Sequence, residues 1–174
     1  MALPLTASQT VGPYFAVGLL DVVGPELVEP GSPGAIRIEG VLLDGAGAPV
    51  PDGVLEIWQA GAQGRYSPDG GFGRCGTDAE GRFHFVTVKP GGVPAPDGRL
   101  QAPHLALGVF ARGLLKRLAT RIYFPDEAEA NAADPVLSSL DDAARATLVA
   151  REDEGVLRFD VRLQGEGETT FFAV

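Results

Sequence analysis

The sequence predicts an all-β protein, a β-sandwich of mainly antiparallel strands with an extended N-terminal arm and a short helical insertion near the C-terminal end. The 24 glycines and 14 prolines divide the 174 residues into short segments, as a domain with many turns requires. Several of these segments alternate apolar and polar residues with the period of a strand. The length suits one domain over residues 1–174, with residues 1–34 as the arm.

The first two strands are expected in AIRIEGVLLD, residues 35–44, and VLEIWQA, residues 54–60. Ile36 and Ile38 share one face of the first strand, and DGAGAPVPDG turns the chain back after it. In the second strand, Leu55 lies on the face opposite Trp58. Each strand therefore has an apolar face that a second sheet can cover.

Four further strands follow. In GRFHFVTV, residues 81–88, the two phenylalanines point inward and His84 points to solvent. PHLALGVFA and RLATRIYF are the next two strands. The last, VLRFDVRLQG, alternates with four inward side chains, namely Leu157, Phe159, Val161 and Leu163.

The helical signal lies in SSLDDAARATLVARE, residues 138–152. Ser139 and Asp142, three positions apart, form a capping pair, and Asp141 adds negative charge at the positive end of the helix. PDEAEANAA, residues 125–133, predicts a helical turn or two before it.

Composition excludes several functional classes. The net charge of -9 and pI of about 4.6 argue against nucleic-acid binding, which needs clustered cations. A single cysteine excludes an internal disulfide, and the first ten residues lack the pattern of a signal peptide. No apolar run approaches the roughly 20 residues that span a bilayer. We therefore expect a cytoplasmic protein with no nucleic-acid or membrane partner.

The residues alone favour no catalytic centre. Cys75 follows Arg74, which would lower the pKa of the thiol, but a lone non-catalytic cysteine is the simpler interpretation. A metal site needs three or four protein ligands, and the chain has only two histidines. An independent metal centre would therefore need an unusual cluster built around His104 and Tyr66. The cations of LLKRLATR, Lys116, Arg117 and Arg121, are explained by a solvated face.

Three stretches take the interpretation further. VLEIWQAGAQGRY, FHFVTVKPGG and APHLAL resemble the intradiol ring-cleaving dioxygenases, whose iron-bearing chains hold Fe(III) with two tyrosines and a His-x-His pair. Tyr66 matches the first tyrosine and His104 the first histidine. No tyrosine follows KPG in GVPAPDGRLQ, and Ala106 replaces the second histidine. The resemblance implies that Tyr66 and His104 are degenerate remnants and that this chain binds no metal.

SQTVGPYF, FARG and RFDVRLQGEGETTFF resemble the α subunit of the heteromeric, protocatechuate-cleaving members of the family. This resemblance implies an iron-bearing β subunit as partner, with Fe(III) in β, and a small aromatic substrate cleaved with O2. The arm would contact the β subunit, and this chain would contribute no catalytic residue. The implied substrate-binding residues are Thr10, Gly12, Pro13, Tyr14 and Arg112.

Two alternatives stay open at this point. The first is that the chain is a non-enzymatic β-sandwich binding or adaptor module, since sandwiches host many functions. The second is that it is a self-sufficient intradiol dioxygenase with substitute ligands. The pairing of TVGPY with FARG argues against the adaptor, and the iron content of the purified chain tests the second alternative.

Overall fold

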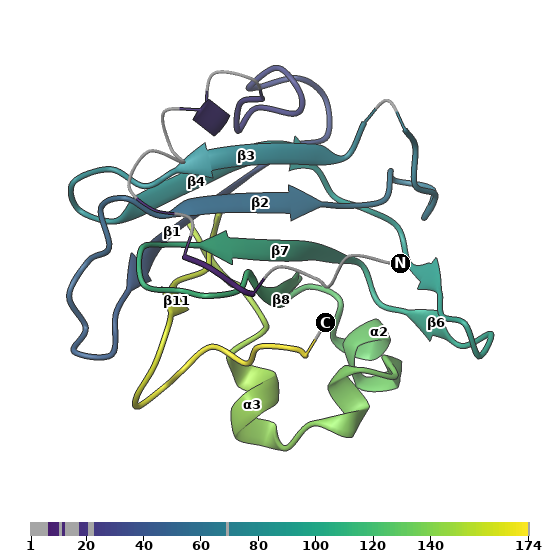
Figure 1. Cartoon of the computed structure of the whole chain (residues 1–174). Helices are drawn as coiled ribbons and strands as arrows, with labels where there is room; N and C mark the ends of the chain where they lie inside the picture. Colours follow the sequence, from purple (N-terminus) through teal and green to yellow (C-terminus); the bar gives the residue numbers. More distant parts are fainter. Residues whose placement is uncertain (1–6, 11, 13–17, 21–22, 69, 174) are drawn as a thin grey trace, which may run out of the picture.

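The computed structural model describes residues 7–10, 12, 18–20, 23–68 and 70–173. Two β-sheets pack face to face, with a small hairpin at one end and short helices beneath (Figure 1). This confirms the predicted β-sandwich. No helix among the described residues is long and apolar enough to cross a bilayer.

The first sheet is built around β1 (Ala35–Leu43). On one side β1 pairs antiparallel with β4 (Arg82–Val88). On the other it pairs in parallel with β10 (Val156–Arg158) and, further along, with β11 (Val161–Arg162). The edge strand β9 (Arg151–Asp153) pairs antiparallel with β10. The chain's last strands therefore return beside its first.

The second sheet has the order β3-β2-β7-β8 and is antiparallel throughout. Its strands are β3 (Phe72–Gly76), β2 (Val54–Trp58), β7 (His104–Phe110) and β8 (Leu118–Tyr123). A separate hairpin joins β5 (Val93–Pro94) to β6 (Leu100–Gln101), just before β7 begins.

The core lies between the two sheets, where their apolar faces meet. Leu55, Ile57 and Leu107 of the second sheet are buried against Ile38 and Phe85 of the first. The inward residues predicted for the last strands also belong to this core, with Phe159 and Val161 buried and Leu157 and Leu163 packed at its margin. The period-two interpretation of these segments is confirmed.

The segment predicted as one strand over residues 156–165 is interrupted, and the physical reason lies in β1. The Val41 N–H donates to the carboxylate of Asp160 at 3.0 Å, so a side chain replaces a rung of the ladder. The carbonyl oxygen of Phe159 lies where a Cβ on Gly40 would stand, 1.8 Å away. Only glycine admits this close crossing, which splits the segment into β10 and β11.

The helical insertion exists, but its predicted cap is wrong. Helix α2 (Ala128–Ala133) and the 3-10 turn η1 (Leu137–Ser139) precede α3 (Asp142–Ala146). The carboxylate of Asp141, not Ser139, caps α3 by accepting from the Ala144 N–H at 2.8 Å. The hydroxyl of Ser139 donates instead to the Val136 carbonyl.

Helix α3 ends early because the chain after it is needed beside β8. The Tyr123 N–H donates to the Leu148 carbonyl at 2.8 Å, and the Ala150 N–H donates to the Tyr123 carbonyl at 3.0 Å. Leu148 and Ala150 are both buried. Strand-like pairing therefore replaces the helix that the sequence pattern predicts beyond residue 146.

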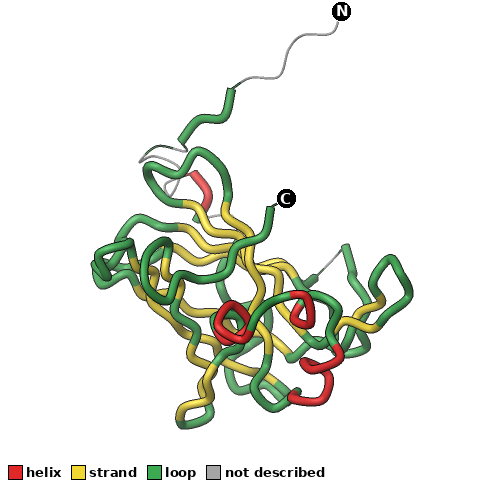
Figure 2. Tube along the Cα trace, turned by 90° about the horizontal axis from the view of Figure 1, so that it is seen from below, coloured by secondary structure: helices red, strands yellow, loops and turns green. Residues whose placement is uncertain are grey.

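The second half of the predicted arm docks on its own chain. The Leu27 N–H donates to the Val86 carbonyl at 2.8 Å, the Val86 N–H donates to Pro25, and Leu27 packs against the core. Residues 7–10 are exposed and project from the body of the sandwich (Figure 2), although Thr10 accepts a hydrogen bond from the Gly113 N–H.

Candidate functional site

The remnant donors lie on the outer face of the second sheet. Alternation along β7 buries Leu105 and Leu107 in the core and turns His104 and Ala106 to the other face. Trp58 of β2 and Arg121 of β8 stand directly opposite Ala106. The position expected to carry a second histidine is therefore a methyl group between an indole and a guanidinium.

His104 is held as a neutral imidazole. Its side chain is buried, with Nδ1 2.8 Å from the Ala102 carbonyl and its ring 5.5 Å from that of Tyr123. Burial lowers the pKa of His104, and the positive charge of Arg121 lowers it further. A neutral ring bonded to a carbonyl carries its proton on Nδ1, so His104 keeps one lone pair, on Nε2.

A buried network fixes Arg121 beside His104. The Arg121 guanidinium donates to the Gln101 amide oxygen at 2.8 Å and to the Tyr123 hydroxyl at 3.1 Å. That hydroxyl donates to the carboxylate of Asp134, which is fully buried and also accepts three backbone N–H groups. Burial raises the pKa of Tyr123 to about 12, so the hydroxyl remains a donor. The expectation of a simple solvated face is wrong for Arg121, which is half-buried.

The residues present do not fit an Fe(III) centre. Tyr66 is 45% exposed and stacks on Trp58, with ring centroids 5.8 Å apart and planes within 8°. His104 offers one nitrogen, Ala106 offers none, and Arg121 adds a fixed positive charge. No group of three His, Cys, Asp or Glu side chains gathers anywhere in the part of the chain that the structure describes. A trivalent cation would meet too few donors and one repelling charge.

Arg112 lies at the opposite end of the same sheet. It follows the end of β7, its side chain is 60% exposed, and its Nε pairs with the carboxylate of Asp52. The backbone N–H of Gly113 donates to the hydroxyl of Thr10 at 3.1 Å. The structure therefore brings Thr10 of the TVGPY segment next to the loop that carries Arg112. Asp52 was not anticipated, because no pattern links it to a residue 60 positions away.

Of the other proposed pocket residues, Gly12 is described, whereas Pro13 and Tyr14 lie outside the described residues. Gly12 has a φ of 74°, in the left-handed region that favours glycine. No described heavy atom lies within 4 Å of where its Cβ would be, so the backbone conformation, and not crowding against the described residues, favours glycine here.

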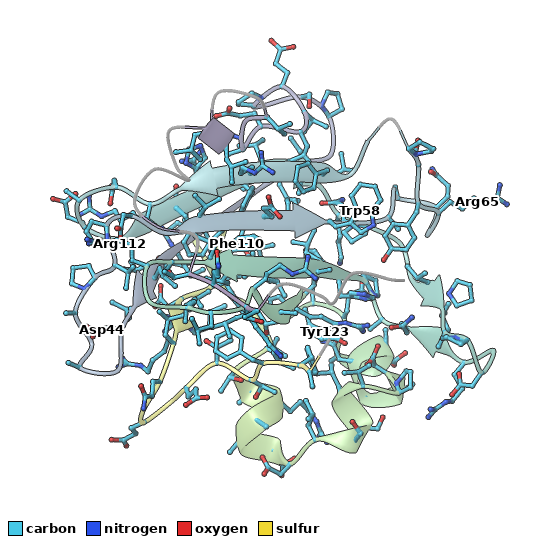
Figure 3. The ribbon with its side chains drawn as sticks, viewed as in Figure 1. Asp44, Trp58, Arg65, Phe110, Arg112 and Tyr123 are labelled. Carbon is cyan, nitrogen blue, oxygen red and sulfur yellow. The ribbon has the colours of Figure 1, made fainter. Side chains whose placement is uncertain are left out.

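The length of β7 separates the two candidate groups. The seven residues of antiparallel strand from His104 to Phe110 span about 20 Å, and Arg112 lies two residues further. Arg112 and Trp58 accordingly stand at opposite ends of the sheet in Figure 3. The guanidinium of Arg112 does not reach the remnant donors of its own chain. A small ligand bound beside His104 therefore cannot also contact Arg112.

Cys75 is not an activated thiol. It lies in strand β3 with 7% exposure, and burial raises its pKa. The expectation that Arg74 would lower this pKa is wrong, because the two side chains point to opposite faces of β3. Arg74 is bonded to Glu56 at 2.8 Å and 2.5 Å on the outer face, whereas Cys75 belongs to the core.

The profile of a family described as dioxygenase matches residues 21–165 of the chain. The protocatechuate 3,4-dioxygenase alpha chain of Burkholderia cepacia is 43% identical over 97% of each chain. The chain belongs to the intradiol dioxygenase family. The beta chain of the Burkholderia cepacia protein is 36% identical over 77% of this chain and 66% of its own length, so the family resemblance extends to both subunit types.

A solved member supports the same fold. The dioxygenase domain of a dioxygenase and carbohydrate-binding fusion protein from Streptomyces sp. SirexAA-E superposes with a TM-score of 0.65 and 28% identity. The alignment covers 92% of this chain and 98% of that domain. The intradiol fold thus accounts for nearly the whole chain.

Proposed function

We propose that the chain is the α subunit of a cytoplasmic, heteromeric protocatechuate 3,4-dioxygenase, which cleaves 3,4-dihydroxybenzoate with O2 to 3-carboxy-cis,cis-muconate. The similarity to a chain of that name, over 97% of both lengths, supports the subunit type. Ring opening is assigned to Fe(III) held by the β subunit. This chain contributes to the wall of the substrate pocket and to assembly, and it supplies no ligand to the iron.

The separation along β7 is the observation that carries the proposal. Arg112 and Thr10 lie together at one end of the sheet, beyond reach of the remnant donors at the other. A charged side chain that is 60% exposed, beside an extended segment, is placed to enter a site on a neighbouring chain. Arg112 therefore acts in trans, on substrate bound to the β subunit.

The residue types at this end suit an aromatic carboxylate. Arg112 supplies a positive charge at any working pH, and a guanidinium binds a carboxylate through paired hydrogen bonds. Thr10 and Gly12 bring backbone close to the ring, Pro13 offers it a rigid apolar surface, and Tyr14 donates a hydroxyl to a polar substituent. These groups hold and orient the substrate, which lowers the entropy cost of reaching the reactive geometry.

Co-expression with a β chain tests the proposal. The isolated chain is expected to be colourless, iron-poor and inactive, whereas the complex binds iron and cleaves 3,4-dihydroxybenzoate. Removing residues 1–14 from the α chain should lower the activity of the complex, and removing only residues 1–6 should not. Stoichiometric iron and ring cleavage in the isolated chain would overturn the proposal. Full activity after removal of residues 1–14 would show that the segment does not line the pocket.

A further inference from the structure

The loop after β7 carries Arg112 in the middle of a tight turn. The Leu114 N–H donates to the Ala111 carbonyl at 3.3 Å, which closes a four-residue turn with Arg112 and Gly113 at its centre. Gly113 has a φ of 87°, which matches the positive φ that a type II turn requires at its third residue. The conformation of Arg112 therefore depends on the form that this turn adopts.

The peptide bond between Arg112 and Gly113 is the movable part of such a turn. Type I and type II turns differ mainly by a flip of this central peptide, and glycine after it accepts either orientation. A flip reverses the direction of the Gly113 N–H and changes the backbone dihedral angle ψ of Arg112. Because the rotamers that a side chain adopts depend on its backbone angles, an acceptor for the Gly113 N–H also restricts the Arg112 side chain.

Thr10 of the N-terminal arm supplies that acceptor. The Gly113 N–H donates to the Thr10 hydroxyl at 3.1 Å, although the two residues are 103 positions apart in the sequence. No backbone carbonyl in the described part of the chain accepts this N–H. Gln9 lines a crevice of about 70 Å³ together with Leu114 and Leu115, so the arm contacts the loop through more than one residue. The arm and the loop of Arg112 thus meet within one chain.

The root of the arm is fixed as well. The Arg74 guanidinium donates to the Leu19 carbonyl at 2.9 Å, and the Arg74 N–H donates to the Gly24 carbonyl at 3.1 Å. The chain is therefore bonded to the second sheet on both sides of residues 11–18, at the β7–β8 loop through Thr10 and at β3 through Leu19. A segment held at both ends has fewer conformations to lose on binding than one held at a single end.

We propose that Thr10 is a positioning residue, whose hydroxyl holds the peptide between Arg112 and Gly113 in one orientation. Arg112 is thereby arranged for the substrate carboxylate before the β subunit binds, and less conformational freedom is lost when the substrate is bound. The hydroxyl acts through Arg112 and does not touch the substrate. The effect on catalysis rests on the proposed function, whereas the hydrogen bond itself belongs to the isolated chain.

Solvent-exchange NMR of the Gly113 amide tests the hydrogen bond in the isolated full chain. Thr10→Val keeps the shape of the side chain but lacks the hydroxyl, so the Gly113 N–H should exchange about two- to tenfold faster, the effect of losing one neutral hydrogen bond. Thr10→Ser keeps a hydroxyl and should exchange like the wild type. Gly98 is the internal control, because it has a φ of 83° in the β5–β6 hairpin and its N–H donates to the Ala95 carbonyl at 2.9 Å.

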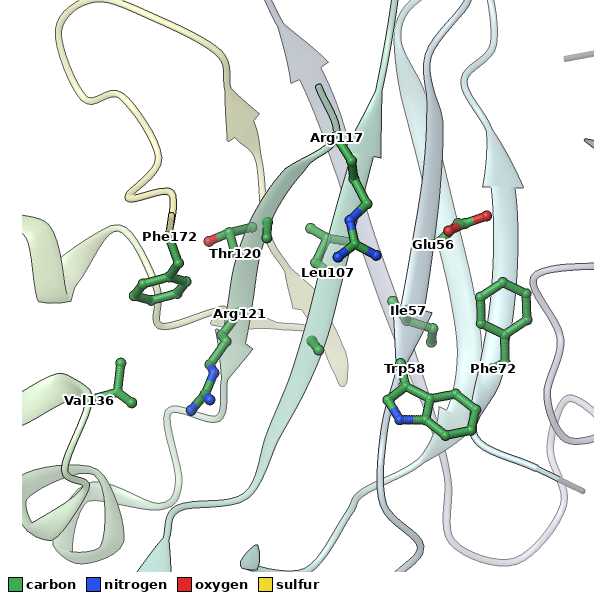
Figure 4. Close-up of a pocket in the computed structure, with 13 residues that line it drawn as sticks. Glu56, Ile57, Trp58, Phe72, Leu107, Arg117, Thr120, Arg121, Val136 and Phe172 are labelled. Atoms are coloured by element: carbon green, nitrogen blue, oxygen red, sulfur yellow. The ribbon is translucent and has the colours of Figure 1, made fainter. Parts of the chain in front are cut away.

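Ring-cleavage kinetics of the complex with a β chain test the positioning role. Thr10→Val should raise KM for 3,4-dihydroxybenzoate about two- to tenfold with little change in kcat, and Thr10→Ser should keep the wild-type KM. In an Arg112→Gln background Thr10→Val should have no further effect, because it acts only through the arginine. Arg117→Gln is the control: it removes a cation at the end of the same loop, but this side chain lines a cleft on the outer face of the second sheet, with Glu56 and Trp58 (Figure 4). Its KM should equal that of the wild type.

Two results would overturn the inference. The first is equal exchange of the Gly113 amide in the wild-type chain and in Thr10→Val, which would show that the hydroxyl does not hold the turn. The second is a further rise in KM when Thr10→Val is added to Arg112→Gln, which would place the hydroxyl on the substrate itself. A wild-type complex that does not cleave the ring would refute the proposed function instead, and the exchange of Gly113 would still decide the hydrogen bond.

Discussion

Replacing Arg112 tests the proposed role of this chain in substrate binding within the complex. A guanidinium bound to a carboxylate contributes about 1.5–3 kcal/mol. Because Arg112 is 60% exposed, the lower end of that range applies, which corresponds to roughly a tenfold change in affinity. In the complex, Arg112→Gln should therefore raise KM for 3,4-dihydroxybenzoate about tenfold. The value of kcat should change little, because the carboxylate is bound equally in the ground and transition states.

The ion pair with Asp52 makes this prediction sharper. In the isolated chain Arg112 is already bonded to Asp52, so the substrate competes with that carboxylate. An exposed pair of this kind is worth about 0.2–1 kcal/mol. Asp52→Asn should thus lower KM, by up to about fivefold. The double variant Asp52→Asn/Arg112→Gln should match Arg112→Gln alone, because Asp52 acts only through the arginine.

Steady-state ring-cleavage kinetics of the reconstituted complex provide the assay. Catechol, which has the vicinal hydroxyls but no carboxylate, is the matched substrate, and its KM should be the same with and without Arg112. Arg99→Gln controls for the loss of one surface charge. A KM for 3,4-dihydroxybenzoate that stays within twofold in Arg112→Gln would refute the reasoning, as would an equal effect on catechol.

Three further predictions concern the rest of the chain. Ala106→His alone should remain iron-poor by metal analysis, because the repulsion between Fe(III) and the Arg121 guanidinium about 6 Å away costs on the order of 2 kcal/mol even at the dielectric constant of water. Adding Arg121→Gln should raise the iron content, and stoichiometric iron in the single variant would contradict this. Cys75 should react with a thiol reagent at neutral pH far more slowly in the folded than in the unfolded chain, because burial raises the pKa of its thiol. Equal reaction rates would show that the thiol is accessible to solvent. Gly40→Ala should destabilise the fold by about 3 kcal/mol or more in urea unfolding, since its Cβ would stand 1.8 Å from a backbone oxygen, whereas Gly70→Ala, with no heavy atom within 4 Å, should not.

The strands that sequence alone predicts are those with one buried and one outer face. β1, β2 and β4 each carry an alternating apolar set that enters the core, so their period is visible in the chain. β3, with the sequence Phe72–Gly76, has two glycines and a cysteine and shows no such pattern. Its strand conformation comes from pairing with β2, a tertiary contact that local pattern does not contain.

The candidate site likewise has residues that the sequence identifies and residues that only the structure identifies. Motif resemblance identifies Tyr66, His104 and the alanine at position 106, because these positions are read directly from the chain. The role of Arg121 comes from the register of β8 on β7, which sets it opposite Ala106. Its fixation by Gln101 comes from the short β5–β6 hairpin. Neither relation has a fixed spacing in sequence, so Arg121 looks like one cation of a solvated face until the sheet is known.

The length of β7 makes the remnant donors and Arg112 independent of each other. His104 at the start of β7 and Arg112 beyond its end are about 20 Å or more apart, further than a Debye length at physiological salt. A substitution at one end should therefore leave the other unaffected. A substitution of Ala106 should leave KM for 3,4-dihydroxybenzoate unchanged in the complex, whereas Arg112→Gln should raise it. Under the proposed function, the loss of iron ligands at one end of β7 therefore places no constraint on the substrate-binding residues at the other.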